Sequence, residues 1–322
     1  MIILSGIQPS GTLHVGNYFG MMRPAIELQE QGEAYYFIAN YHSMTSVFDA
    51  DERRKNTLDV ALDFLACGLD PAKSVFFRQS DVPEVCELTW LLTTLTPMGL
   101  LERCHSYKDK LAKGLSPNHG LFAYPVLMAA DILIYDSNVV PVGRDQKQHV
   151  EVTRDIAIKF NQAYGETFVI PEPKIRDSVA VVPGTDGQKM SKSYGNSVGL
   201  ADSEEDITDR LSRMKTDTRR QRRTDPGVPE DCPVYELHEI YSSDEERKEV
   251  SEGCRSASIG CLDCKKIMIG HVLEQLRPIR ERREKLAASS GLVEEVLAAG
   301  NERARQKAEL TMTRVRAAMG LA

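Results

Sequence analysis

The sequence predicts a doubly wound α/β domain built on a parallel, Rossmann-like sheet, followed by an all-helical C-terminal domain. From residue 1 to about residue 185, short apolar runs alternate with longer segments of helical periodicity, which is the pattern of a parallel sheet covered by helices. After Gly199 the chain changes to charged helical stretches. We therefore expect one domain over residues 1–195 and a second, helical domain over residues 196–322.

The individual elements follow from these periodicities in chain order. Apolar runs predict strands at residues 2–4, 34–39, 74–78 and 139–143. Helical periodicity predicts helices at residues 51–67, 121–135, 148–164, 265–285 and 293–319. In such folds ligands bind at the carboxyl ends of the strands, near the point where the strand order reverses.

Composition restricts the class of protein. The net charge is −7, with 42% hydrophobic and 27% charged residues, which is ordinary for a globular protein and leaves no general attraction to nucleic acid. We therefore expect no DNA partner, and RNA contacts only through local basic patches. The apolar runs are too short to span a bilayer, the N-terminus reads as a strand rather than a leader, and the seven cysteines are an odd number. These features predict a cytoplasmic protein without a membrane partner.

The first stretch of interest is residues 2–17, in which an apolar run is followed by turn residues and a predicted helix. Thr12 is the expected N-cap, so His14 and Gly16 fall in the first helical turn. A strand, a glycine turn and a helix start direct backbone N–H groups at an anion. His14 can donate to a phosphate, and Gly16 lets a flat ring approach the backbone. The spacing matches neither the dinucleotide fingerprint nor the P-loop, and a turn that merely needs small residues explains it equally well.

A second stretch, residues 184–195, is flanked by glycine, rich in hydroxyl groups and carries Lys189 and Lys192 three positions apart. Two ammonium groups on a mobile loop suit the charge that develops on a leaving pyrophosphate. Together, residues 12–17 and 189–193 resemble the two signature motifs of class I aminoacyl-tRNA synthetases. With residues 6–11, 124–133 and 140–149 included, the chain resembles the bacterial tryptophanyl-tRNA synthetase family along essentially its whole length.

That resemblance implies an ATP- and Mg²⁺-dependent ligase, expected to be a homodimer, with L-tryptophan and tRNA(Trp) as partners. Residues 1–195 would form the catalytic domain and residues 196–322 the anticodon-binding domain. The resemblance implies catalytic roles for Gln8, His14, Lys189 and Lys192, although family members often carry Thr at the position of His14. It implies nucleotide contacts for Gln8, Pro9, Ser10, Gly16, Asn17, Gly143, Arg144, Asp145, Val181, Lys189, Met190, Ser191, Lys192 and Ser193. It implies contacts to tryptophan for Tyr124, Met128, Asp131 and Gln146.

Asp131 is unusual even without the resemblance, because it is a carboxylate within the strongly apolar run 126–134. A buried carboxylate needs hydrogen-bond donors, and an indole N–H is one candidate. A site of that kind rejects phenylalanine, which would leave the acceptor unpaired. The alternative is a carboxylate satisfied by a helix end or a neighbouring Arg. The residues alone leave both readings open, and the resemblance favours the indole contact.

Cys232, Cys254, Cys261 and Cys264 lie close together in the C-terminal region, and the last two form C-x-x-C. Four thiols at this density predict a metal site, either tetrahedral zinc or an iron–sulfur cluster, with chance clustering as the other reading. A minority of bacterial tryptophanyl-tRNA synthetases carry a similar pattern that holds a [4Fe–4S] cluster. We therefore expect such a cluster, with structural zinc as the alternative.

A basic run in the same region is opposed only by Asp217 and consists of Arg213, Lys215, Arg219, Arg220, Arg222 and Arg223. It reads either as a solvated face or as a surface for tRNA phosphates. Two other functions also stay open. A tyrosyl-tRNA synthetase shares both motifs, but the apolar surroundings of Asp131 argue against it. A small-molecule adenylyltransferase uses a similar nucleotide site, but would not require the helical C-terminal region.

Overall fold

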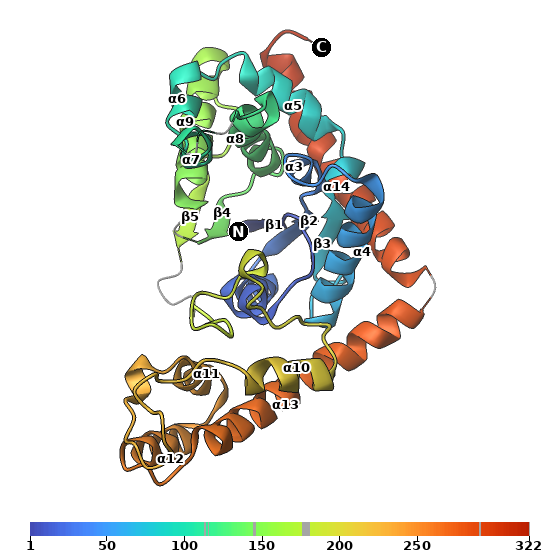
Figure 1. The fold of residues 1–322 in the computed structure, drawn as a ribbon. Coiled ribbons are helices and arrows are strands. Elements are labelled where there is room, and N and C mark those ends of the chain that lie inside the picture. The colour runs from blue at the N-terminus through green and yellow to red at the C-terminus, as the bar shows by residue number, and fades with distance from the viewer. Residues whose placement is uncertain (113, 115, 144–145, 176–180, 290, 322) are drawn as a thin grey trace.

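The structure is a computed structural model that describes residues 1–112, 114, 116–143, 146–175, 181–289 and 291–321 (Figure 1). Its centre is a five-stranded sheet in the order β3-β2-β1-β4-β5. The strands are β1 (Ile2–Ile7), β2 (Glu33–Ile38), β3 (Ser74–Arg78), β4 (Val139–Val142) and β5 (Glu172–Ile175). All neighbouring strands run parallel, and the strand order reverses between β1 and β4. The doubly wound prediction is therefore confirmed.

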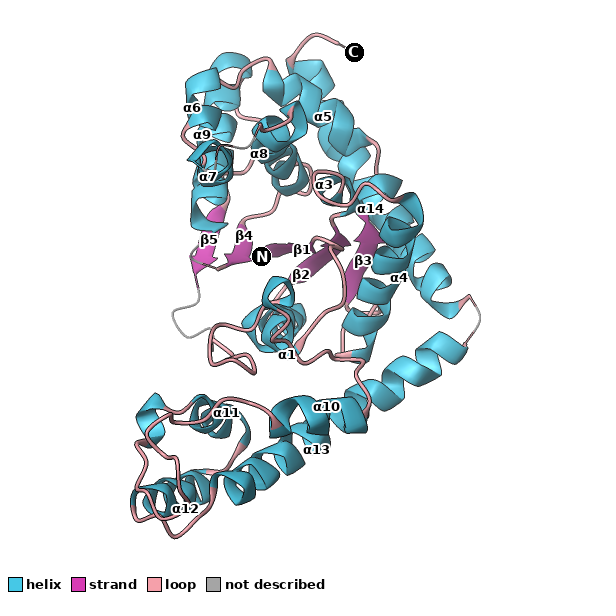
Figure 2. Ribbon diagram, in the orientation of Figure 1, coloured by secondary structure: helices cyan, strands magenta, loops and turns pink. Residues whose placement is uncertain are grey.

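The helices of the first 170 residues cover both faces of this sheet, as Figure 2 shows. They are α1 (Val15–Asn17), α2 (Arg23–Glu27), α3 (Asn40–Ser43), α4 (Ala50–Ala66), α5 (Glu84–Thr93), α6 (Met98–Glu102), α7 (His105–Ala112), α8 (His119–Leu133) and α9 (Lys147–Tyr164). Successive strand residues point to opposite faces because the side-chain period of a strand is two. Phe76 therefore joins the core beneath α4, and Phe77 joins the core beneath α5 and α8.

The C-terminal region begins with α10 (Glu204–Ser212), α11 (Pro233–Tyr241) and α12 (Asp244–Arg255), which lie apart from the sheet in Figure 1. The long helix α13 (Cys261–Ala288) connects them to the sheet domain. There Arg283 donates to Asp63 Oδ1 at 2.6 Å and to Asp59 Oδ1 at 2.9 Å, both on α4. Burial raises the pKa of the Asp63 carboxyl to about 6, although the Arg283 guanidinium opposes the shift. This partly buried ion pair fixes α13 to α4, one of the helices that cover the sheet.

The last helix, α14 (Leu292–Ala318), returns to the sheet and covers the free edge of β3 (Figure 1). Asn301 Oδ1 accepts from the backbone N–H of Arg78 at 3.0 Å, and Arg303 donates to the carbonyl of Ser74 at 3.1 Å. These bonds satisfy backbone groups that an edge strand leaves unpaired. The structure thus places α14 on the sheet, although the sequence predicts it within the C-terminal domain. Within the described ranges, no helix combines the length and apolar character needed to span a membrane.

Gly300 makes the close approach of α14 to β3 possible, which yields a first prediction. A Cβ at Gly300 would lie 1.8 Å from the carbonyl oxygen of Phe76. We expect Gly300→Ala to lower the free energy of unfolding by about 3 kcal/mol, because the helix must move off the strand. Gly270→Ala in α13 is the control, since a Cβ there meets nothing within 4 Å. It should stabilise the protein by about 0.5–1 kcal/mol. Urea unfolding of both variants measures the difference, and equal effects would contradict the packing described.

Candidate active site

The turn after β1 is organised by His14 rather than by Thr12. His14 is the N-cap of α1: its Nδ1 accepts from Asn17 N at 3.3 Å, and its own N–H donates to Asn17 Oδ1 at 3.0 Å. The prediction of Thr12 as the N-cap was wrong, because the chain stays extended as far as His14. Burial lowers the pKa of His14, which favours a neutral ring. Since Nδ1 accepts, the neutral ring carries its proton on Nε2, where it can donate to a ligand.

The extended segment before α1 pairs with the segment that follows the lysine loop, which we define as residues 184–195. Val15 N donates to Val198 O at 2.9 Å, and Leu200 N donates to Leu13 O at 3.0 Å. This pairing brings the two motifs together across about 180 residues of sequence. At the same place a Cβ on Gly11 would lie 1.7 Å from Lys192 Nζ. The ammonium group of Lys192 therefore rests directly against the glycine turn.

The lysine loop is held at its base by the buried side chain of Asn196. Its Oδ1 accepts from Ser191 N at 2.8 Å, while its Nδ2 donates to Asp186 Oδ1 at 2.7 Å and to Lys189 O at 3.2 Å. The Met190 side chain is buried in the core and anchors the loop from inside. Lys189, Lys192 and Ser193 are exposed. The loop therefore presents its cations to solvent from a fixed base.

The other predicted nucleotide residues occupy the carboxyl edge of the sheet. Gln8 follows β1 and donates from Nε2 to Ser46 Oγ at 3.2 Å. Gly143 follows β4 and is exposed, and the parallel pairing of β1 with β4 brings both strand ends to the same edge. Arg144 and Asp145 lie outside the described residues. Of the remaining residues, Pro9 is buried, Ser10 is exposed, Gly16 and Asn17 are half-buried, and Val181 is 61% exposed.

Asp131 is 2% exposed and has two side-chain partners. His42 Nε2 lies 2.9 Å from its Oδ2, and Gln79 Nε2 lies 2.8 Å from Oδ1 and 2.9 Å from Oδ2. The partners are therefore a histidine and a glutamine, not the helix end or Arg that the sequence offered as the alternative. Sequence reasoning missed both. Each is a polar residue just after an apolar strand, His42 beyond β2 and Gln79 beyond β3, and that placement is the signal that could have found them.

Two of the remaining residues predicted for tryptophan lie on the same helix as Asp131. Tyr124 and Met128 precede it on α8 at spacings of seven and three residues, so all three share one face of the helix. Tyr124 OH hydrogen-bonds His149 Nε2 at 2.8 Å, and its ring meets His42 edge-on at a centroid distance of 6.1 Å. Gln146 is the N-cap residue of α9. The structure thus places aromatic, thioether and carboxylate groups on one face of α8.

The four cysteines of the C-terminal region line one small cavity, together with Arg220. Nη1 of Arg220 lies 3.7 Å from Cys254 Sγ, and its Nε is buried without a hydrogen-bond partner in the described part of the chain. Among the described residues, however, no group of three or more His, Cys, Asp or Glu side chains is close enough to hold a metal ion. The thiols converge, but they do not form a single-ion site.

The basic run is not opposed by Asp217 alone, so that part of the sequence interpretation was wrong. Arg219 pairs with Asp217 at 2.8 Å and with Asp231 at 2.5 Å. Arg220 turns inward to the cysteine cavity, where its Nη2 donates to the Ile259 carbonyl at 3.0 Å. Two members of the run therefore support the fold. Exposed members include Lys215 and Arg222.

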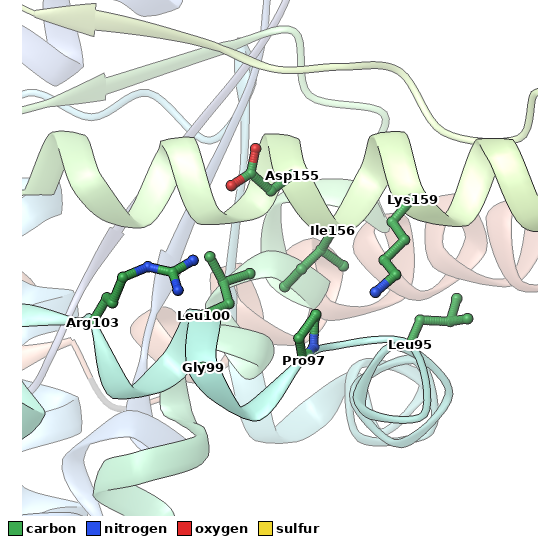
Figure 3. A pocket seen from close by; sticks show the side chains of 8 residues that line it. All are labelled: Leu95, Pro97, Gly99, Leu100, Arg103, Asp155, Ile156 and Lys159. Carbon is green, nitrogen blue, oxygen red and sulfur yellow. The ribbon is translucent and has the colours of Figure 1, made fainter.

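A separate cavity of about 240 Å³ lies between α6 and α9 (Figure 3). Its walls are formed by Leu95, Pro97, Gly99, Leu100, Arg103, Asp155, Ile156 and Lys159. Figure 3 shows apolar side chains between Arg103 at one end and Lys159 at the other. None of the predicted site residues lines it, so we do not assign it to the active site.

Comparison with known proteins agrees with this geometry. The family model described as tRNA synthetases class I (W and Y) matches residues 1–276. The tryptophan–tRNA ligase of Fusobacterium nucleatum is 48% identical over 319 residues, which cover 99% of this chain and 97% of that protein. The tryptophan–tRNA ligase of Rhodopirellula baltica is 49% identical over 321 residues, which cover 100% of both.

Among solved structures, tryptophanyl-tRNA synthetase from Campylobacter jejuni complexed with ADP and tryptophan matches with a TM-score of 0.93 and 45% identity, covering 100% of both chains. This chain therefore belongs to the class I tRNA synthetases of the tryptophan and tyrosine family. The full-length relatives named above are tryptophan–tRNA ligases, so within that family it groups with the tryptophan enzymes. The resemblance predicted from the motifs is confirmed.

Proposed function

We propose that this chain activates L-tryptophan with ATP to form tryptophanyl-adenylate and pyrophosphate, and then transfers tryptophan to tRNA(Trp). The observation that carries the proposal is the contact between the glycine turn and the lysine loop, in which Lys192 Nζ rests against Gly11. Both ATP-handling motifs thus face one space at the carboxyl edge of the sheet. The relatives of this chain, which are tryptophan–tRNA ligases along their whole length, support the same function.

Adenylation needs no protein nucleophile, because the carboxylate of tryptophan itself attacks the α-phosphate. The chain therefore acts by position and charge. We propose that Gln8, Pro9, Ser10, Gly16, Asn17 and Gly143 surround the nucleotide, with Val181 beside adenine. The His14 Nε2–H donates to a phosphate oxygen. Lys189 and Lys192 stabilise the departing pyrophosphate, helped by Ser191 and Ser193. The buried side chain of Met190 anchors the loop that carries them. ATP would enter as its Mg²⁺ complex, and the protein would not need to supply most of the ligands of the ion.

We propose that Asp131 accepts the indole N–H, with Tyr124, Met128 and Gln146 around the ring. The support is burial: at 2% exposure, the Asp131 carboxylate gains little from water and depends on fixed donors. Phenylalanine lacks the N–H and would leave one acceptor position empty. The tyrosyl alternative is weakened by relatives at 48% and 49% identity that are tryptophan enzymes. The adenylyltransferase alternative is weakened because the family match extends through residue 276, well into the helical region.

We also propose that Cys232, Cys254, Cys261 and Cys264 hold a [4Fe–4S] cluster. A single zinc ion is disfavoured, because it needs four ligand atoms about 2.3 Å from one point and the described side chains offer no such group. A four-iron cluster binds each thiolate through a different iron and spans a wider cavity. The buried, unpaired Nε of Arg220 fits an anionic group in that cavity. When bound, the cluster would cross-link α11, α12 and α13, which is a structural role.

The exposed members of the basic run, including Lys215 and Arg222, are proposed to contact tRNA phosphates. Arg219 and Arg220 are not assigned this role, since Arg219 pairs with Asp217 and Asp231 and Arg220 turns inward to the cysteine cavity. The homodimer implied by the family resemblance is part of the proposal as well, and sedimentation or light scattering tests it.

The main test is ATP–pyrophosphate exchange measured separately with each of twenty amino acids. We expect exchange with tryptophan, little with tyrosine or phenylalanine, and a dependence on Lys192. Lys192→Ala should slow single-turnover adenylate formation by about 10²–10³-fold, because its charge acts on the departing pyrophosphate, while tryptophan affinity stays nearly unchanged. Lys55→Ala on α4 is the control for loss of one exposed lysine. Wild-type adenylation in Lys192→Ala, or exchange driven by another amino acid, would contradict the proposal.

Metal analysis tests the cluster. Anaerobically purified protein should be brown and contain about four irons per chain. Cys261→Ser should lose the iron, whereas Cys86→Ser, at an exposed cysteine away from the cavity, should keep it. A colourless protein with about one zinc, or with neither metal, would refute the assignment.

The tRNA surface is tested by the salt dependence of binding. Lys215→Ala with Arg222→Ala should weaken tRNA binding and reduce the slope of log affinity against log salt by about 1–2, because up to two phosphate contacts are lost. Adenylate formation should not change. Arg54→Ala with Lys55→Ala removes the same charge from α4 and serves as the control. An unchanged slope in the first variant would show that the run is only a solvated face.

A further inference from the structure

Gln79 is a buried side chain that lies next to the amino-acid site without facing solvent. It follows β3 directly and is 1% exposed. Both ends of its amide are bonded. Oε1 accepts from the backbone N–H of Tyr41 at 3.0 Å, and Nε2 donates to the two oxygens of Asp131 at 2.8 and 2.9 Å. The amide therefore cannot rotate without breaking bonds at both ends.

We propose that Gln79 is a positioning residue for amino-acid selection: it orients the Asp131 carboxylate so that one oxygen faces the indole N–H. This inference rests on the proposed role of Asp131 as the indole acceptor. Gln79 acts through Asp131 and does not touch the substrate. Its contribution therefore shows as a preference for ligands that carry the N–H.

The hydrogen bonds around Asp131 indicate which oxygen is available. An ionised carboxylate has about four lone-pair positions. Gln79 occupies one on Oδ1, while Gln79 and His42 together occupy two on Oδ2. Counting only the part of the chain that the structure describes, the unused position is therefore on Oδ1. Without the Gln79 donor, the carboxylate could turn about its χ2 bond, which is a soft torsion.

The support for Gln79 extends to the helix that carries the other donor. The next residue, Ser80, is tied to Asn40 twice: Asn40 Nδ2 donates to Ser80 Oγ at 2.7 Å, and Ser80 N donates to Asn40 Oδ1 at 3.0 Å. Asn40 begins α3, and His42 lies on the same helix. The end of β3 and α3 thus form one connected unit that holds both donors to Asp131.

Opposing effects act on the pKa of Asp131. Burial raises the pKa of its carboxyl group, while the His42 and Gln79 hydrogen bonds oppose the rise. Only the ionised form is purely an acceptor, so the two donors favour the form that can accept the indole N–H. Among the described residues, Tyr135 and Cys86 are further titratable groups that interact with this carboxylate.

The test compares two ligands that differ in the N–H alone. L-tryptophan and 3-benzothienyl-L-alanine, in which sulfur replaces the N–H, are titrated calorimetrically against the full-length protein. The wild type should prefer tryptophan by about 10–100-fold, the range for a hydrogen bond to a charged group. Asp131→Ala should abolish most of this preference. Gln79→Met, which removes the donor at similar volume, should reduce the preference by at least about threefold through loss of orientation.

A matched control variant keeps the test decisive. Gln29→Met is the matched control, because Gln29 also has both amide ends bonded, donating to Gly68 O at 3.2 Å and accepting from Asp70 N at 2.9 Å. It should keep the wild-type preference.

The outcomes separate this inference from the proposed function. If Gln79→Met weakens both ligands equally while Asp131→Ala loses the preference, Gln79 is merely structural and the inference fails alone. If Gln79→Met keeps the wild-type preference, the donor to Asp131 does not matter, which also overturns it. If Asp131→Ala keeps the preference, the role of Asp131 as indole acceptor fails first.

Discussion

The proposed active site depends on two backbone hydrogen bonds that join Leu13 and Val15 to Leu200 and Val198. The reaction requires that groups on either side of the triphosphate be fixed relative to each other, because position and charge supply the acceleration. The glycine turn comes from the sheet, whereas the lysine loop comes from the chain after the last strand. Their pairing converts two separate anion-binding segments into one site, and Asn196 then fixes how far the loop extends from it.

The proposed selection of the amino acid depends on a different feature, a buried carboxylate whose lone pairs are nearly all occupied by donors of the described residues. Asp131 is held by His42 from α3 and by Gln79 from the end of β3. Three elements from both halves of the sheet therefore define one acceptor direction. A carboxylate supported in this way costs less to bury than a free one, and in the proposed role it would discriminate because its last position accepts only a donor.

The C-terminal helices are connected to the catalytic sheet more closely than a separate domain would be. Arg283 on α13 pairs with Asp63 on α4, and α14 lies along β3 with Gly300 against its backbone. A helix that covers the edge strand also prevents pairing with another chain.

By itself, the sequence determined the chemistry and the local structure. The strand at Ser74–Arg78 and the two motifs follow from short-range patterns, and the apolar surroundings of Asp131 marked it as a special carboxylate. Only the tertiary structure decided which groups meet. Gln79 and His42 are 52 and 89 residues from Asp131, and Arg220 turns inward from a run that reads as surface charge. Periodicity records which face of an element is apolar, but the partner of that face is chosen by long-range packing, which no local pattern encodes.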